Sequence, residues 1–220
     1  MRLLFIRHGE PDYGNDCLTE TGHIQAQRCA ERLKSEGIDL IFSSSMGRAR
    51  QTAQYTADIL GKDIQILDYM HEIVWGHEGV RDYHHDDSPW VITDRMAAED
   101  GDLLDAGWAE GRWFSGNKCV ENVRMIAEET DAFLAELGHV REGRYYRNTT
   151  GTDDRRTIAL FAHGGSSSAA IAHILGLPFP FVCASIHMDV TSISILRFEH
   201  RSNAIGIPVM ELINDVGHLR

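Results

Sequence analysis

Two short apolar runs in this sequence are each followed within two residues by a histidine and a glycine. The first run spans residues 3–6 and precedes His8, and the second spans residues 158–161 and precedes His163. Short apolar runs that stop abruptly at polar residues are typical of buried strands. Ligands of open α/β sheets bind at the carboxyl ends of such strands. We therefore expect the two imidazoles to share one crevice at the edge of a sheet.

Strand-type and helix-type segments alternate along the first third of the chain. In each helix-type segment the apolar residues recur at helical intervals, and a glycine follows that is suited to end a helix. The expected elements are strands at 2–6, 39–43 and 64–67 and helices at 21–34 and 46–60. This alternation predicts parallel pairing. The fold class that we expect is α/β, a three-layer α/β/α sandwich with a mostly parallel central sheet.

The remainder of the chain is expected to complete the same sheet. The pattern predicts helices at 120–137 and about 166–175, a strand at 157–162, and β-rich runs at 190–198 and 204–213. The last two runs are separated by a polar stretch, which is the pattern of a hairpin.

Three other stretches show no regular pattern. The polar stretch 141–156 contains two glycines and is expected to be an exposed loop. Pro178 and Pro180 predict an irregular crossing of the chain. Between 77 and 116 tryptophans mix with acidic residues, and we interpret this stretch as a lid insert that selects the substrate within a single domain spanning 1–220. Packing is the commoner use of such tryptophans, and an aromatic cage is the alternative.

The overall charge excludes some partners. Lys and Arg number 21 against 33 Asp and Glu, which gives a formal net charge of −12. A negative net charge disfavours binding to nucleic acid or to an anionic membrane. A phosphate site in this protein therefore requires a local basic pocket. No stretch has the roughly 18 uninterrupted apolar residues of a membrane span. We expect a soluble, cytoplasmic protein, and the sequence leaves a homodimer open.

Neither the cysteines nor the histidine-rich stretch indicates a metal or a cofactor. The four cysteines are scattered without paired spacing, so neither a disulfide framework nor a zinc site is indicated. Residues 84–87 read His-His-Asp-Asp. Adjacent residues rarely point at one ion, so we interpret this stretch as a solvated acidic loop and expect no metal site.

Arginines accompany the two histidines. Arg7 precedes His8, and Arg48 lies at the start of the second predicted helix. Guanidinium groups bind phosphate oxygens through paired, charge-assisted hydrogen bonds. Gly9 and Gly164 beside the rings would let backbone N–H groups approach an anion. Two arginines and two histidines therefore predict a phosphoryl-binding pocket, whereas Arg50 is expected on a solvated helix face.

The order of these motifs resembles that of the histidine phosphatase superfamily, also called phosphoglycerate mutase-like. The motifs are Leu4-Phe5-Ile6-Arg7-His8-Gly9-Glu10, Leu18-Thr19-Glu20-Thr21-Gly22-His23-Ile24-Gln25-Ala26, Ser44-Ser45 through Arg48-Ala49 with Gln51-Thr52-Ala53, and His163-Gly164-Gly165. The resemblance covers most of the chain apart from 77–116. Asn15 stands one place later than the asparagine that frequently follows the first motif in this family, which leaves its contact with phosphate open.

The resemblance implies a role for each matching residue. His8 is the nucleophile that becomes a phosphohistidine, and Arg7, Arg48 and His163 bind the phosphoryl group. A mid-chain acid protonates the leaving oxygen. Glu72 is our choice for that acid, and Glu78 is the competitor.

Several functions remain open at this point. A neutral imidazole attacks phosphorus without a metal, so we expect a metal-independent phosphatase acting on a small phosphomonoester. Family mutases carry adjacent arginines for the substrate carboxylate in this insert, and here Arg81, Arg95 and Arg112 are isolated, which favours hydrolysis. A phosphoglycerate mutase-type phosphotransferase and a non-catalytic phosphate-binding module are the alternatives, and the substrate is left open.

Overall fold

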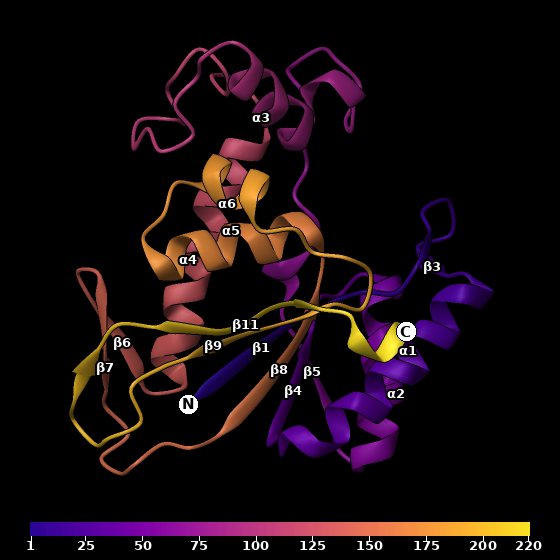
Figure 1. Ribbon diagram of the computed structural model, residues 1–220, viewed down its shortest axis with the longest axis vertical. Coiled ribbons are helices and arrows are strands. Elements are labelled where there is room, and N and C mark those ends of the chain that lie inside the picture. Colours follow the sequence, from indigo (N-terminus) through magenta and orange to yellow (C-terminus); the bar gives the residue numbers. More distant parts are fainter.

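A six-stranded sheet forms the centre of the computed structural model, which describes residues 1–220 (Figure 1). The strands of the chain are β1 (Arg2–Arg7), β2 (Pro11–Asp12), β3 (Cys17–Leu18), β4 (Leu40–Ser43), β5 (Ile64–Ile66), β6 (His139–Glu142), β7 (Tyr145–Asn148), β8 (Thr157–Ala162), β9 (Ile193–Arg197), β10 (Ile205–Gly206) and β11 (Val209–Asp215). The helices are α1 (Glu20–Leu33), α2 (Gly47–Leu60), α3 (Pro89–Ala98), α4 (Cys119–Glu136), α5 (Gly164–Leu175) and α6 (Phe179–Ser185). The alternation predicted for the first third of the chain is confirmed.

The central sheet is mostly parallel, as predicted. Its strand order is β11-β9-β1-β8-β4-β5, and the neighbours among β1, β8, β4 and β5 pair in parallel. β9 runs antiparallel to both β1 and β11, so the predicted hairpin completes the sheet. β1 and β8 are direct neighbours with Arg7 opposite Ala162. The two histidine-bearing strands therefore end side by side.

Alternate residues of the central strands enter two separate cores. Leu3 and Phe5 lie in the larger core, which includes residues of α4 and α5. Leu4 and Ile6 lie in the smaller core, which includes residues of α1 and α2. Side chains of a strand point alternately to its two faces. The helices therefore cover both faces of the sheet, which confirms the three-layer sandwich.

Two of the irregular stretches are ordered as secondary structure. The expectation of a loop over 141–156 is wrong, because β6 and β7 pair as an antiparallel hairpin there and β10 adds a third strand. The irregular crossing at Pro178 and Pro180 is also wrong, because α6 begins there with proline in its first turn. The first turn of a helix tolerates proline, since its N–H groups have no partner within the helix.

The stretch 77–116 contains one helix, α3, which begins at a proline and packs against α6. Figure 1 shows this stretch at one end of the molecule, beyond α5 and α6 and away from α1 and α2. Its aromatic side chains join the larger core in part. No helix of the structure combines the length and the apolar character that crossing a membrane requires.

Candidate active site

His8 and His163 meet at the carboxyl ends of β1 and β8. Their ring centroids lie 5.1 Å apart with an interplanar angle of 60°. Both rings are buried, with exposed fractions of 1% for His8 and 0% for His163. The parallel register of β1 and β8 produces this proximity, because each histidine directly follows its strand. The two imidazoles are therefore adjacent, while neither ring lines the pocket described below.

Gly9 serves backbone packing beside His8. Its N–H donates to Thr52 Oγ1 at 3.0 Å, and a Cβ on Gly9 would lie 2.6 Å from the carbonyl oxygen of Gly22 in α1. The sequence-based expectation that this N–H faces an anion is therefore wrong. Gly164, in contrast, lines the pocket described below.

Arg48 lies in the first turn of α2 and reaches the His8 ring. Its Nε donates to His8 Nε2 at 3.3 Å, and its Nη1 donates to Asp16 at 2.5 Å. Only 4% of Arg48 is exposed, whereas Arg50 points to solvent as expected. Arg7 donates from Nη1 to the Met188 carbonyl at 2.5 Å. Two guanidinium groups therefore lie beside the paired imidazoles.

Asp16 is a member of this site that the motifs did not reveal. Its second carboxylate oxygen accepts the Gly47 N–H at 2.6 Å, at the N-terminus of α2. Asn15, the residue compared with the family asparagine, instead donates to Asp12 at 2.8 Å and is exposed. Asp16 has a left-handed φ of 49°, a region that aspartate adopts more readily than most residues, and no sequence motif marks this position.

Glu72 is held against the N-terminus of α5. Its Oε1 accepts the N–H groups of Ile73 at 3.0 Å, Gly165 at 3.0 Å and Ser166 at 3.2 Å. Burial raises the pKa of the Glu72 carboxyl, while the Arg7 charge and these N–H donors oppose the rise. Glu78, the competing acid, is exposed and does not line the pocket. Of the two carboxyls, only Glu72 faces the arginines.

Both imidazoles are neutral at ordinary pH. Burial, together with the charges of Arg7 and Arg48, lowers the pKa of His8 to about 3. Burial likewise lowers the pKa of His163 well below its usual value. His163 Nε2 lies 2.9 Å from Ser44 Oγ, and its Nδ1 is buried without a hydrogen-bond partner. Arg7 Nε is also buried and unpartnered.

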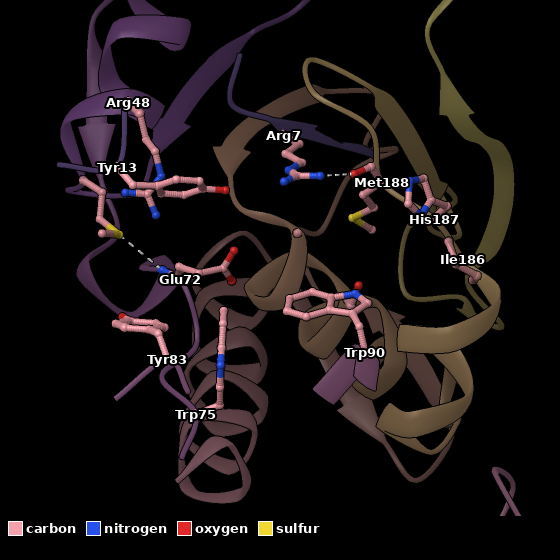
Figure 2. A pocket seen from close by; sticks show the side chains of 13 residues that line it. Arg7, Tyr13, Arg48, Glu72, Trp75, Tyr83, Trp90, Ile186, His187 and Met188 are labelled. Atoms are coloured by element: carbon pink, nitrogen blue, oxygen red, sulfur yellow. Dashed lines mark hydrogen bonds between the residues drawn. The ribbon is translucent and has the colours of Figure 1, made fainter. Parts of the chain in front are cut away.

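A pocket of about 650 Å³ opens in front of these groups (Figure 2). Its lining comprises Arg7, Tyr13, Met46, Arg48, Glu72, Trp75, Tyr83, Trp90, Gly164, Ser168, Ile186, His187 and Met188. Figure 2 shows Arg7 and Arg48 at one end, Trp75, Tyr83 and Trp90 at the other, and Glu72 between them. Neither His8 nor His163 is part of the lining, and both rings lie buried behind it. The pocket therefore has a cationic end and an aromatic end.

The histidine-rich stretch lies outside this pocket. The carboxylate of Asp87 lies 3.6 Å from His77 Nε2 and 3.5 Å from His84 Nδ1. The side chains of His85 and Asp86 are 84% and 71% exposed, which fits a solvated loop. No group of three or more His, Cys, Asp or Glu side chains is arranged to hold a metal ion, and all four cysteines are free thiols.

Comparisons with known proteins agree with this architecture. A probable phosphoglycerate mutase of Enterobacter sp. strain 638 is 28% identical over 231 residues, which cover all of this chain and 95% of the relative. The crystal structure of a phosphoserine phosphatase from Entamoeba histolytica superposes with a TM-score of 0.67 at 21% identity, covering 100% of this chain and 99% of that one. A mycobacterial glucosyl-3-phosphoglycerate phosphatase superposes with a TM-score of 0.64 at 24% identity, covering 97% and 98%.

The family is shown by a separate comparison. The model of the histidine phosphatase superfamily, branch 1, matches residues 3–207, which include both histidine motifs and the intervening insert. This chain belongs to the histidine phosphatase superfamily.

Proposed function

We propose that this chain is a phosphomonoesterase that transfers the phosphoryl group of a small substrate to His8 and then to water. The observation that carries the proposal is the pair of neutral, buried imidazoles 5.1 Å apart beside Arg7 and Arg48. Arg7 Nε and His163 Nδ1 are buried nitrogens without partners. Unpaired buried polar groups are costly, and a phosphoryl oxygen is a suitable acceptor for both.

The first step breaks the bond between phosphorus and the leaving oxygen. The lone pair of His8 Nε2 forms the new N–P bond, and Glu72 gives its proton to the leaving alkoxide, so the alcohol departs neutral. Arg7, Arg48, His163 and the backbone of Gly164 hold the phosphoryl oxygens and offset the charge that spreads over them. The raised pKa of Glu72 supports its role as the acid, because more of the carboxyl stays protonated.

The second step returns His8 to its starting state. Water attacks phosphorus as Glu72, now a carboxylate, takes its proton. The N–P bond breaks, and inorganic phosphate leaves. Every charge and proton transfer in both steps is supplied by side chains, so we propose metal-independent turnover. We expect activity to persist in the presence of a chelator, whereas loss that a divalent ion reverses would contradict the proposal.

Phosphoglycerate mutase activity is the second candidate, because the curated relative is named a probable mutase. A mutase must hold the substrate carboxylate while the phosphoryl group moves between positions. The arginines of the pocket lining are Arg7 and Arg48 alone, and our proposal assigns both to the phosphoryl group. Hydrolysis is therefore favoured. A coupled assay that finds the isomeric acid and no free phosphate would decide for the mutase.

The covalent step is tested with His8→Ala. We expect this variant to lose turnover and to form no acid-labile phosphoprotein when mixed with 4-nitrophenyl phosphate, because it lacks the proposed nucleophile. His85→Ala is the matched control, because that side chain is 84% exposed and lies outside the pocket. A non-catalytic binding module would instead show no phosphoprotein in the unaltered chain.

The acid role is tested with Glu72→Gln on two kinds of leaving group. A poor leaving group such as an alkoxide needs a proton in the transition state, and nitrophenolate does not. General acid catalysis contributes roughly 10²–10⁴-fold, so we expect a loss of at least about 100-fold on alkyl phosphates and a much smaller loss on 4-nitrophenyl phosphate. Equal losses on both would remove Glu72 from this role.

A further inference from the structure

The aromatic end of the pocket is assembled from two separate segments. Trp75 follows Glu72 closely in the chain, whereas Tyr83 and Trp90 come from the 77–116 stretch. The ring of Trp75 meets that of Tyr83 at 4.7 Å and 90° and that of Trp90 at 5.6 Å and 81°. Perpendicular edge-to-face contacts of this kind are favoured between aromatic rings. The Trp75 ring is thus nearly perpendicular to the other two, and we call the three rings the aromatic wall. Figure 2 shows this wall facing the arginines.

Backbone contacts hold this wall in place. Trp75 Nε1 donates to the His84 carbonyl at 3.1 Å, and the Tyr83 N–H donates to the Trp75 carbonyl at 2.9 Å. Tyr83 also has a left-handed φ of 60°, which is uncommon for a bulky residue. Such backbone strain persists where surrounding structure enforces it, and it is concentrated at functional sites. The aromatic surface is thus preorganised.

The aromatic wall begins directly beside the phosphoryl end. A Cβ placed on Gly164 would lie 3.7 Å from Arg7 Cζ and 3.9 Å from Trp90 Cζ2. The same glycine therefore borders both the guanidinium and the indole. A substituent that extends from the bound phosphoryl group into the pocket therefore reaches the Trp90 ring within a few atoms.

The charges of the lining disfavour a second anionic group on the substrate. Arg7 and Arg48 lie at the phosphoryl end, and Glu72 adds an acidic group between the two ends. His187, the remaining titratable base of the lining, pairs with Asp189 at 3.1 Å and is 76% exposed. A carboxylate or second phosphate at the aromatic end would thus find no guanidinium or ammonium partner.

We infer that the substrate is a phosphomonoester of an uncharged alcohol that carries an aromatic ring within a few atoms of the ester oxygen. This inference rests on the proposed function and assigns to the 77–116 stretch the recognition of that ring through Tyr83 and Trp90. The ring packs against Trp90 and Trp75 while the phosphoryl group occupies the arginine end.

The test compares two alkyl phosphates, 2-naphthylmethyl phosphate and glycerol 2-phosphate. Both release an unactivated alcohol, and the naphthyl ester carries an aromatic ring where glycerol 2-phosphate carries two hydroxyl groups. Aromatic contacts of this kind are worth about a tenfold change in binding. We expect kcat/KM to be at least about tenfold higher for the naphthyl ester, and we expect Trp90→Ala to lower it far more for that ester than for glycerol 2-phosphate, so that most of the preference is lost.

Two further variants control for folding and for general loss of a tryptophan. Trp90→Phe keeps an aromatic face and is expected to retain most of the preference. Trp113→Ala removes a tryptophan that lies against Arg112 and the larger core but outside the pocket, and it is expected to leave the preference for the naphthyl ester unchanged. Equal kcat/KM for the two esters, or a preference that survives Trp90→Ala, would overturn the inference.

A binding measurement separates this inference from the proposed reaction. 2-Naphthylmethylphosphonate cannot be hydrolysed at its carbon–phosphorus bond and reports binding alone. We expect calorimetry to find it bound about tenfold more tightly than methylphosphonate. Tighter binding without any phosphoprotein would support the aromatic site and reject the phosphatase. A phosphoprotein on His8 with equal binding of the two phosphonates would do the reverse.

Discussion

The Gly9 carbonyl oxygen decides which nitrogen of His8 is free to react. His8 Nδ1 lies 2.7 Å from this oxygen, and a carbonyl only accepts hydrogen bonds, so Nδ1 carries the proton. The lone pair is therefore on Nε2, which faces Arg48 Nε at 3.3 Å. In the proposed reaction an incoming phosphoryl group would replace this bond to Arg48. One residue thus sets the tautomer, and another bonds to the nitrogen that we propose as the nucleophile.

The pH dependence of turnover is expected to follow Glu72 and not His8. The pKa of His8 is lowered to about 3, so the nucleophile stays neutral as the pH falls toward that value. The pKa of Glu72 is raised, and its protonated form is lost as the pH rises through that pKa. We expect the ratio of alkyl to 4-nitrophenyl phosphate turnover to be highest at acid pH and to fall as pH rises.

This ratio is the informative measurement once it is corrected for the second ionisation of each ester, which lies near pH 6 for an alkyl phosphate and lower for the nitrophenyl ester. A ratio that does not change with pH would contradict the assignment of Glu72. A ratio that decreases as the pH is lowered from about 7 to 5 would also contradict it, because an ordinary histidine titrates in that range.

Asp16 is expected to weaken the binding of substrate phosphate. Its carboxylate pairs with Arg48 Nη1 at 2.5 Å, so an incoming dianion meets both a competitor and a like charge. The side chain of Asp16 is 41% exposed but that of Arg48 is only 5% exposed, so we expect this pair to lie at the upper end of the range of about 0.2–1 kcal/mol that exposed pairs contribute. We expect Asp16→Asn to lower KM about two- to fivefold with little change in kcat.

The control for this variant removes a charge from the same loop. Asp12 accepts hydrogen bonds from Gly14 and Asn15 and does not touch Arg48, so Asp12→Asn reports the general effect of charge. A rise in KM for Asp16→Asn alone would show that the carboxylate chiefly positions Arg48 for binding.

Single residues differed in how well the sequence predicted them. His8, His163, Arg7 and Arg48 follow strands or begin a helix, so the sheet topology alone brings them together. The placement of Asp16 depends on the path of an irregular loop, which no periodic pattern describes.

At the level of elements, the N-terminus of α5 has no room for added volume beside Glu72. A Cβ on Gly165 would lie 2.4 Å from Ile73 Cγ1 and 2.6 Å from Glu72 Oε1. Gly165 therefore lets the helix donate its N–H groups to the Glu72 carboxylate. The sequence shows a Gly-Gly pair, but only the fold reveals that the second glycine accommodates the proposed acid.

Gly165→Ala is expected to displace Glu72 and to slow the turnover of alkyl phosphates. Misplacement of a catalytic group by about 1 Å costs on the order of 100-fold. We expect a loss of about 10- to 100-fold on alkyl phosphates and a smaller one on 4-nitrophenyl phosphate. Ser167→Ala, in the same turn, removes a buried hydroxyl without a partner and is the matched control. Unchanged activity in Gly165→Ala would show that the helix terminus tolerates the methyl group.

Elements were predictable where burial imposes a period and unpredictable where other contacts decide. β8 is buried throughout, so its uninterrupted apolar run identified it. β6 and β7 carry many polar residues and pair outside the central sheet, so their stretch was interpreted as a loop. α6 was missed because two prolines stand at its start, and α3 was missed because no apolar periodicity marks it.

At the scale of the whole molecule, one end of β8 leads to the candidate active site and the other end lies beside a buried polar cluster. The carboxyl end leads to His163, and the residues just before the amino end form a buried polar cluster around Asp154, which is 4% exposed. The six residues of β8 span about 20 Å at the usual rise per residue. Changes in the cluster are therefore expected to alter stability and to leave the active site intact.

Asp154→Asn tests this separation. The carboxylate accepts hydrogen bonds from His139 at 2.9 Å and from the Arg156 side chain at 2.9 and 2.8 Å. In asparagine an NH2 group replaces one of the two carboxylate oxygens, so N–H donors of the side chain face the donors of His139 and Arg156. An unsatisfied buried polar group costs about 1–3 kcal/mol. We expect urea unfolding at pH 7 to show a free energy of unfolding lower by about that amount, with kcat per folded molecule unchanged.

The effect of Asp154→Asn is also expected to depend on pH. Hydrogen bonds from Arg156 and His139 outweigh burial and hold the pKa of Asp154 below its usual value, so the native state favours the carboxylate. The stabilisation is present above the unfolded-state pKa of about 3.9 and is lost as pH falls toward the native one. The difference in the free energy of unfolding between the unaltered protein and Asp154→Asn should therefore become smaller below about pH 4. Asp153→Asn, one residue away and exposed, is the control for the loss of a charge. A difference in unfolding free energy that becomes larger in acid would show that the Asp154 carboxylate does not cause it.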